Sequence, residues 1–374
     1  MTRPSGRWGL VVLLTLLSCT SLPSRAQVRL ASLTGPTRYS GSAPDIESHF
    51  QPFATGWTGA DGLYSIALGP QRHLWLFGDT LIGSRQGPSR TIASMPRNSL
   101  AVQTNGQWRF FWRSGPKGDV FAPPHPQHWF WPGPGTLYQG KLYLLLPEFA
   151  PDATGGVFGF RHAGLYLVTV SNPEADPADW RIDYRALSWG TQSGNEGPTA
   201  YSVAALVASD QLYVYGYADR ASRRQARLLR IALADLASGQ SESYWDGRGW
   251  SPRAEEAVPL FDGFHSEASV HWFAALNQGH GGYGLIYSAP DLYSRILMRT
   301  APAPTGPWSE AQQLYQIPET RPGVFCYAAK HHPHLAGSQS ELVLGYACNA
   351  SDPGRLESDG ELYLPRFVRL PLPE

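Results

Sequence analysis

Two aspartates near the start of the chain have the type and spacing of a catalytic carboxylate pair. Asp61 lies in the segment Gly59–Ser65, and Asp79 ends the apolar run Leu74–Asp79. The turn Gly69–His73 lies midway, so a hairpin would place Asp61 opposite Asp79. Opposed residues of an antiparallel pair have Cβ atoms about 4.5–5.5 Å apart, and one of two such close carboxylates tends to keep a proton. The pattern favours carboxylate-based hydrolysis; two turn-capping aspartates are the open alternative.

The run that carries Asp79 recurs in variant form along the chain. Similar apolar runs begin at residues 74, 142, 212, 284 and 342, and each follows a turn signal. Further strand-like stretches precede and follow most runs. This period predicts an all-β fold, a five-bladed β-propeller of four-stranded antiparallel blades. The segment from Val28 to Phe53 is expected to supply an N-terminal strand that completes the last blade. A β-sandwich with long loops is the rival fold.

Composition agrees with a chain of short strands and excludes one class of partner. The 374 residues include 39 Gly, 32 Pro and 12% aromatic residues, but only 16% charged residues. The 30 basic and 30 acidic residues balance, so the sequence has no electrostatic footprint for nucleic acid.

The N-terminus has the pattern of a secretory signal. Arg3 and Arg7 precede the short apolar run Gly9–Leu17, so residues 1–26 are predicted to be a signal peptide and 27–374 one domain. Cleavage before Cys19 would give a lipidated N-terminus, and ordinary cleavage after Ala26 is the alternative. We therefore expect an exported protein, either a lipoprotein of the bacterial cell envelope or a secreted one. Its only membrane contact would be the N-terminal lipid.

Folding each run as a hairpin brings further polar and aromatic side chains to the rim that holds Asp61. Those predicted to bind substrate are Trp131, Glu148, Tyr201, Glu267, His271 and Tyr327. Trp131 offers a flat face that can stack on a sugar ring. A wide gap between the aspartates would make Glu148 or Glu267 a third carboxylate.

Metal and disulfide chemistry leave two questions open. Neighbouring histidines in His331–His334 point to opposite faces of a strand, so no metal site is assigned there. His271 helps to hold a cation in the central channel, orients an acid, or is structural. No cofactor is required, and a structural calcium ion is an option. Cys326 and Cys348 would face each other if the last hairpin turns near Gly337. A disulfide is then expected in an exported protein, with two buried thiols as the alternative.

The opening motifs match a known family pattern. Trp57-x-Gly-x-Asp61-Gly-x-x-Ser65, Leu74–Thr80 and Arg97-Asn98-Ser99 resemble the signature of the domain-of-unknown-function family 4185. That family is similar to five-bladed propeller glycosidases, including family 43-like enzymes, and some members are endo-D-arabinanases of glycoside hydrolase family 183. The resemblance implies catalytic roles for Asp61 and Asp79 and a pocket role for Asn98.

The sequence therefore predicts a glycoside hydrolase that acts on a polysaccharide, furanose-containing and arabinan-like if the resemblance extends to substrate. A monomer is expected, with a polysaccharide or oligosaccharide as its partner. The alternatives are a non-catalytic glycan-binding envelope lipoprotein and a scaffold propeller that binds proteins. The roles of the two aspartates and the stereochemical outcome stay open.

Overall fold

The chain folds as an all-β protein with a few short helical turns. The computed structural model describes residues 42–50, 55–115, 117–153, 159–189, 199–220, 223–290 and 294–373. All described residues belong to one compact unit. Within the described ranges, no helix has the length and apolar character needed to cross a membrane. The signal segment and Cys19 lie outside the described residues.

The first two large sheets follow the predicted hairpin pattern. The first has the order β2 (Tyr64–Gly69), β3 (Arg72–Phe77), β6 (Ser99–Thr104) and β7 (Gln107–Phe111). The second contains β8 (Trp129–Phe130), β9 (Gly135–Tyr138), β10 (Lys141–Pro151), β11 (Phe160–Val170) and β12 (Ile182–Leu187). Each is a meander of antiparallel strands, and the inner strands β3 and β10 carry runs of consecutive buried side chains.

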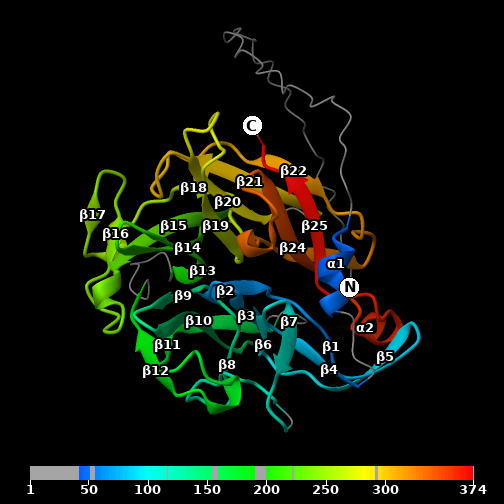
Figure 1. Cartoon of the computed structure of the whole chain (residues 1–374). Helices are drawn as coiled ribbons and strands as arrows, with labels where there is room; N and C mark the ends of the chain where they lie inside the picture. Colours follow the sequence, from blue (N-terminus) through cyan, green and yellow to red (C-terminus); the bar gives the residue numbers. More distant parts are fainter. Residues whose placement is uncertain are drawn as a thin grey trace, which may run out of the picture. The chain divides into compact units, whose positions relative to one another are not determined.

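Three further sheets repeat the meander. The third contains β13 (Ala200–Ala208), β14 (Gln211–Arg220), β15 (Arg223–Ala232), β16 (Ser243–Trp245), β17 (Trp250–Ser251) and β18 (Phe261–Asp262). The fourth has the order β19 (Ala268–Phe273), β20 (Gly282–Ser288), β21 (Arg295–Ala301) and β22 (Gln312–Gln316). The fifth has β23 (Val324–His331), β24 (Glu341–Ala350) and β25 (Arg366–Pro371). Figure 1 shows β2, β13 and β19 near the middle of this unit and β12, β17 and β22 further out.

A sixth sheet was not predicted. It consists of β1 (Thr55–Ala60), β4 (Thr80–Gln86) and β5 (Ser89–Ser94). Strands β1 and β4 continue the ribbon of β2 and β3 beyond the two aspartates, so one long hairpin belongs to two sheets.

The helical elements among the described residues are all short. They are α1 (Pro44–Glu47), η1 (Ser48–Phe50), η3 (Pro177–Asp179), η5 (Leu233–Asp235), η6 (Ala254–Glu256), η7 (Pro333–Leu335) and α2 (Gly354–Ser358).

The arrangement is propeller-like, and the number of blades stays a prediction. The sheets have between three and six strands rather than four each. The expected N-terminal closure is represented by one antiparallel bridge, Ser42 to Val368, and residues 27–41 lie outside the described part. Apolar side chains fill the spaces between neighbouring sheets: Leu74 and Leu144 share one cluster, and Val214 and Leu145 share another. Burial between sheets therefore stabilises the positions of the inner strands.

Candidate active site

The long first hairpin places Asp61 opposite Asp79. Tyr64 pairs with Leu76 on one side of the aspartates, and Ala60 pairs with Thr80 on the other. The register is the same in both pairs, so Asp61 falls opposite Asp79 between them. The Gly78 amide donates to the Asp61 carbonyl at 3.0 Å. The predicted hairpin is confirmed, and its two carboxyl groups lie where the ribbon passes from one sheet to the next.

Two phenols hold the Asp61 carboxylate. Tyr327 and Tyr363 both donate their hydroxyls to Asp61 Oδ2, at 2.6 and 2.7 Å. Asn349 Nδ2 donates in turn to the Tyr327 hydroxyl at 3.2 Å. One carboxylate oxygen of Asp61 is therefore occupied by neutral donors, while Oδ1 faces Gly78. A Cβ atom at Gly78 would lie 2.2 Å from Asp61 Oδ1, so only glycine leaves room for this carboxylate.

Asp79 has partners of a different kind. Arg97 Nη1 contacts Asp79 Oδ2 at 2.9 Å, and the Trp131 indole donates to Asp79 Oδ1 at 2.8 Å. The Arg97 guanidinium also lies over the Trp129 ring, 4.8 Å from its centroid, and its backbone amide donates to Asp119 at 2.6 Å. A fixed cation thus accompanies Asp79.

These surroundings give the two carboxyl groups different electrostatic environments. Burial, with the neighbouring Asp79 and Glu267 carboxylates, raises the pKa of Asp61 from 3.8 to about 7, although its phenol partners oppose the rise. Burial also raises the pKa of Asp79, while Arg97 and then Trp131 hold that pKa down. Because the cation stabilises charge on Asp79, the shared proton belongs on Asp61 near neutral pH.

Strained backbone surrounds the Asp61 carboxylate. Leu63, Ala328 and Tyr363 have φ values of 58°, 64° and 66°, the left-handed region that L-residues rarely adopt. All three are buried, and Tyr363 itself contacts Asp61. Such strain persists only where the surrounding structure enforces it, and it gathers at functional sites.

Glu267 approaches the same site from the start of β19. Its Oε1 pairs with Lys330 Nζ at 2.8 Å, and its side chain is 20% exposed. Glu267 is therefore the additional carboxylate close enough to act electrostatically on Asp61.

Three other predicted residues lie in structural roles. Asn98 is buried; its Nδ2 donates to Phe121 O and Phe130 O and its Oδ1 accepts from the Phe121 amide, so it anchors a loop. Glu148 is buried and pairs with His128 Nδ1 at 2.8 Å. Tyr201 is 1% exposed and packs in the core formed with Tyr244, so it does not line the aspartate site. Trp131 contacts Asp79 and also packs against Phe149 and Phe160 rather than standing free for stacking.

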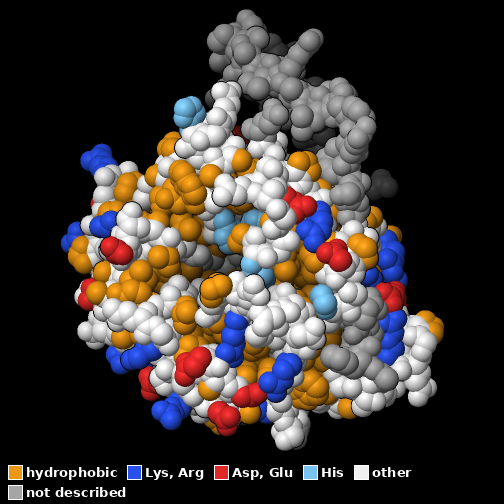
Figure 2. Space-filling view, in the orientation of Figure 1, with side chains coloured by type: hydrophobic (Ala, Val, Ile, Leu, Met, Phe, Trp, Pro, Cys, Tyr) orange, Lys and Arg blue, Asp and Glu red, His pale blue; other side chains and the backbone are white. Residues whose placement is uncertain are grey.

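His271 lines a cavity along the inner strands, and Lys330 lines the same cavity. The cavity has a volume of about 60 Å³, and its lining includes Ser65, Ser269, His271, Lys330, His331 and His332. Figure 2 shows histidine side chains around a hollow in this face. Each water needs at least about 10–15 Å³ of such space, so the cavity can hold a few waters.

The cavity fits a structural calcium ion poorly. Ca²⁺ takes six to eight oxygen ligands, whereas the lining offers serine hydroxyls and imidazoles. Burial lowers the pKa of His271 to about 4, so this ring is neutral at pH 7. Among the described residues, no group of three or more histidines, cysteines or carboxylates could hold a metal ion.

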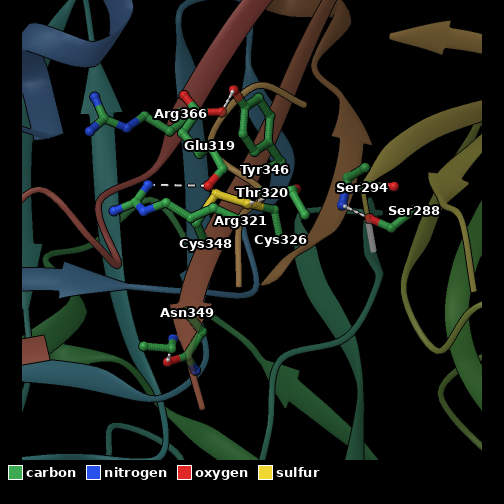
Figure 3. Close-up of a disulfide and its surroundings, with 12 residues drawn as sticks. Ser288, Ser294, Glu319, Thr320, Arg321, Cys326, Tyr346, Cys348, Asn349 and Arg366 are labelled. Atoms are coloured by element: carbon green, nitrogen blue, oxygen red, sulfur yellow. Dashed lines mark hydrogen bonds between the residues drawn. A yellow bond between two sulfur atoms is a disulfide. The ribbon is translucent and has the colours of Figure 1, made fainter. Parts of the chain in front are cut away.

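A disulfide lies beside the Asp61 partners. Cys326 and Cys348 are directly paired on β23 and β24 and are joined through their Sγ atoms. Figure 3 shows the disulfide between these strands, with Asn349 one residue further along β24. Because Tyr327 follows Cys326 and Asn349 follows Cys348, the cross-link ties together the two strands that hold the Tyr327–Asn349 hydrogen bond.

Two residues that contact the aspartates, Arg97 and Tyr363, were not predicted from the sequence. Arg97 was visible only as part of the Arg97-Asn98-Ser99 motif, in which Arg97, not Asn98, contacts a carboxylate. Tyr363 follows the last predicted hairpin, and only the folded loop before β25 brings it to Asp61.

The fold and site define a propeller-like all-β protein with an opposed, partly buried carboxylate pair. The chain belongs to the family described as Domain of unknown function (DUF5005), whose model matches residues 47–371. The matching family is therefore not the family 4185 that the opening motifs resemble.

This chain is similar to a curated protein and to solved structures, and the structure with the higher TM-score supports the fold. Over 213 residues it is 23% identical to the Notoamide biosynthesis cluster protein J′ of Aspergillus versicolor. The matched region covers 53% of this chain and 56% of that protein. A structure from Bacteroides ovatus ATCC 8483, described as "a putative hydrolase", has a TM-score of 0.71 at 20% identity and covers 88% of this chain and 89% of its own. The family 117 glycoside hydrolase Zg3597 of Zobellia galactanivorans has a TM-score of 0.49 at 12% identity and covers 84% and 85%.

Proposed function

We propose that this protein is a glycoside hydrolase in which Asp61 and Asp79 act as the catalytic carboxylates. The observation that carries the proposal is the opposed pair with unlike partners: two phenols on Asp61 and a guanidinium on Asp79. Glycosidases use two carboxyl groups, one protonated and one ionised, on either side of the scissile bond. Environments that separate two carboxyl groups in this way assign the acid and the base.

The surroundings assign a role to each aspartate. Asp61, with a pKa of about 7, holds a proton at neutral pH and can release it, as a general acid must. In the proposed reaction it protonates the glycosidic oxygen as the bond between that oxygen and the anomeric carbon breaks. Asp79, kept charged by Arg97, stabilises the positive charge that develops on the sugar ring and acts as the nucleophile or base.

Water completes the reaction in both stereochemical outcomes. Its oxygen bonds to the anomeric carbon, and its proton returns to a carboxylate. In the retaining case this water cleaves a glycosyl ester formed on Asp79; in the inverting case it attacks directly.

The substrate and location belong to the same proposal. A polysaccharide outside the cytoplasm, such as a furanose-containing arabinan-like polymer, suits an exported protein. The N-terminal signal pattern and the disulfide support export, since disulfides persist in oxidising compartments. Lipidation at Cys19 and a monomeric state are part of this proposal.

A polysaccharide panel tests the proposal. Wild type should release oligosaccharides from at least one polymer, with products identified by chromatography and mass spectrometry, and Asp61→Asn should release none. Asp219→Asn is the matched control, because Asp219 ends the corresponding run of the third sheet but pairs with Arg224; it should behave as wild type. Tight glycan binding without turnover by any variant would instead indicate a glycan-binding protein and would refute the enzyme.

A further inference from the structure

A buried ammonium group contacts residues 61–63, the segment between β1 and β2 that is called the Asp61 loop below. Lys330 Nζ donates to Gly62 O at 2.5 Å, to Glu267 Oε1 at 2.8 Å and to Ala328 O at 3.2 Å. The Lys330 side chain is only 2% exposed. An ammonium has three N–H groups, so these three acceptors use all of them.

The three acceptors belong to separate parts of the chain. Gly62 follows Asp61 in the first hairpin, Glu267 precedes β19, and Ala328 lies within β23. A buried charge is tolerated only when it is paired and hydrogen-bonded. Glu267 supplies the opposite charge, and the Tyr64 ring lies 4.1 Å from Nζ, a favourable cation–π distance. Burial lowers the pKa of Lys330, and the Glu267 and Asp61 carboxylates oppose that change.

Because of a bulge, one strand, β23, contacts both the Asp61 and the Glu267 carboxylates. The pairing of β23 with β24 shifts between Tyr327 and Lys330, where Ala328 adopts φ 64°. A bulge re-aims side chains along a strand. Here the Tyr327 hydroxyl reaches Asp61 and, three residues later, the Lys330 ammonium reaches Gly62 and Glu267.

We propose that Lys330 is a positioning residue, which holds the Asp61 loop, the Tyr327 bulge and Glu267 in one arrangement and fixes Glu267 as a third carboxylate facing the site. Glu267 Oε1 accepts from Lys330 Nζ, and the Glu267 side chain keeps a partial exposure of 20%. The catalytic meaning of this arrangement rests on the proposed hydrolase function, whereas the arrangement itself does not.

The charges around Asp61 predict in which direction the pKa of Asp61 changes when Glu267 or Lys330 is replaced. The charged and titratable groups that face Asp61 are Asp79, Glu267, Lys330, Tyr327 and Tyr363. Replacing the Glu267 anion by an amide should lower the pKa of Asp61, because a repelling charge is lost. Replacing the Lys330 cation by methionine should raise it, because an attracting charge is lost.

Carboxyl NMR measures these changes without any substrate. The protein is labelled with ¹³C at the aspartate side-chain carboxyls, and the Asp61 signal is assigned by its absence in Asp61→Asn. Glu267→Gln should shift the Asp61 titration down, and Lys330→Met should shift it up, each by about one pH unit. Asp219→Asn, which removes an exposed carboxylate paired with Arg224, should leave the titration unchanged.

The outcomes separate positioning from simple structural support. Opposite shifts in the two variants support the proposal; shifts in the same direction, or none in either, overturn it. Should Lys330→Met not fold, Glu267→Gln alone carries the test, and an unchanged Asp61 titration in that variant refutes the proposal. Because no turnover is measured, a failure to find glycan hydrolysis would leave this result intact.

Kinetics extend the test once a hydrolysed glycan is known. Glu267→Gln should raise KM about tenfold if Glu267 contacts the substrate. Lys330→Met should lower kcat at least tenfold with KM within about twofold of wild type, and Lys330→Arg should not restore kcat, since a planar guanidinium cannot serve the same three acceptors. An unchanged KM in Glu267→Gln would contradict the role of Glu267 as a carboxylate facing the substrate.

Discussion

Replacing Asp61 by asparagine should stabilise the protein at alkaline pH. The folded protein raises the pKa of Asp61 from 3.8 to about 7, so the folded state binds this proton more tightly than the unfolded chain does. The resulting stabilisation is fully present below pH 3.8 and is lost as pH rises through 7. The two pKa values correspond to a loss of about 4 kcal/mol, at about 1.4 kcal/mol per pH unit.

Asparagine keeps the shape and an acceptor oxygen for Tyr327 and Tyr363 but cannot ionise. The free energy of unfolding of Asp61→Asn minus that of wild type should therefore grow by up to about 4 kcal/mol between pH 4 and pH 8. Urea denaturation followed by tryptophan fluorescence at half-unit pH steps measures this difference. Asp183→Asn removes an exposed strand carboxylate and should show no such growth. A difference that is equal at pH 4.5 and pH 8.5 would refute the assignment of the buried proton to Asp61.

Three further changes test the surroundings of this carboxylate. Tyr327→Phe removes a hydrogen bond worth about 1.5–3 kcal/mol to the charged form, so carboxyl NMR should show the pKa of Asp61 rising by at least about one unit; a fall would contradict the geometry. Gly78→Ala places a Cβ 2.2 Å from Asp61 Oδ1 and should reduce hydrolysis at least a hundredfold while the circular dichroism spectrum is kept, whereas full activity would show that Asp61 Oδ1 does not need this space. The double change Cys326→Ser, Cys348→Ser should lower the free energy of unfolding by about 2–4 kcal/mol, as measured in urea; equal stability would mean that the cross-link contributes little.

The sequence predicted the elements that local pattern controls. Leu74–Asp79 and its later relatives are short, continuous apolar runs, as found in fully buried strands. Turn residues mark the hairpin ends, so the hairpins and the opposition of Asp61 and Asp79 could be predicted from local pattern. The Cys326–Cys348 register followed from the same midpoint argument. The continuation of the first ribbon into β1 and β4 was not predicted, because Thr55–Ala60 is rich in small residues and has no strand-like apolar run.

The residues that hold the carboxylates depend on contacts between distant segments. Tyr363 and Asp61 are 302 positions apart, and the left-handed backbone that carries Tyr363 has no glycine to mark it. Tyr201 was expected at the rim because its strand begins there, but a register shift early in β13 accompanies its burial between sheets. Asn98 was assigned to a pocket by resemblance, whereas its amide satisfies backbone groups of the following loop.

The central claim is that Asp61 and Asp79 cleave glycosidic bonds. The most direct measurement is the rate of reducing-end release from the most responsive polysaccharide of the panel, compared among wild type, Asp61→Asn, Asp79→Asn and Asp219→Asn. The account predicts that Asp219→Asn matches wild type within about twofold and that each of the other two variants falls by at least about a thousandfold, as expected for groups that act in the transition state. Undiminished release by Asp61→Asn or Asp79→Asn would contradict it.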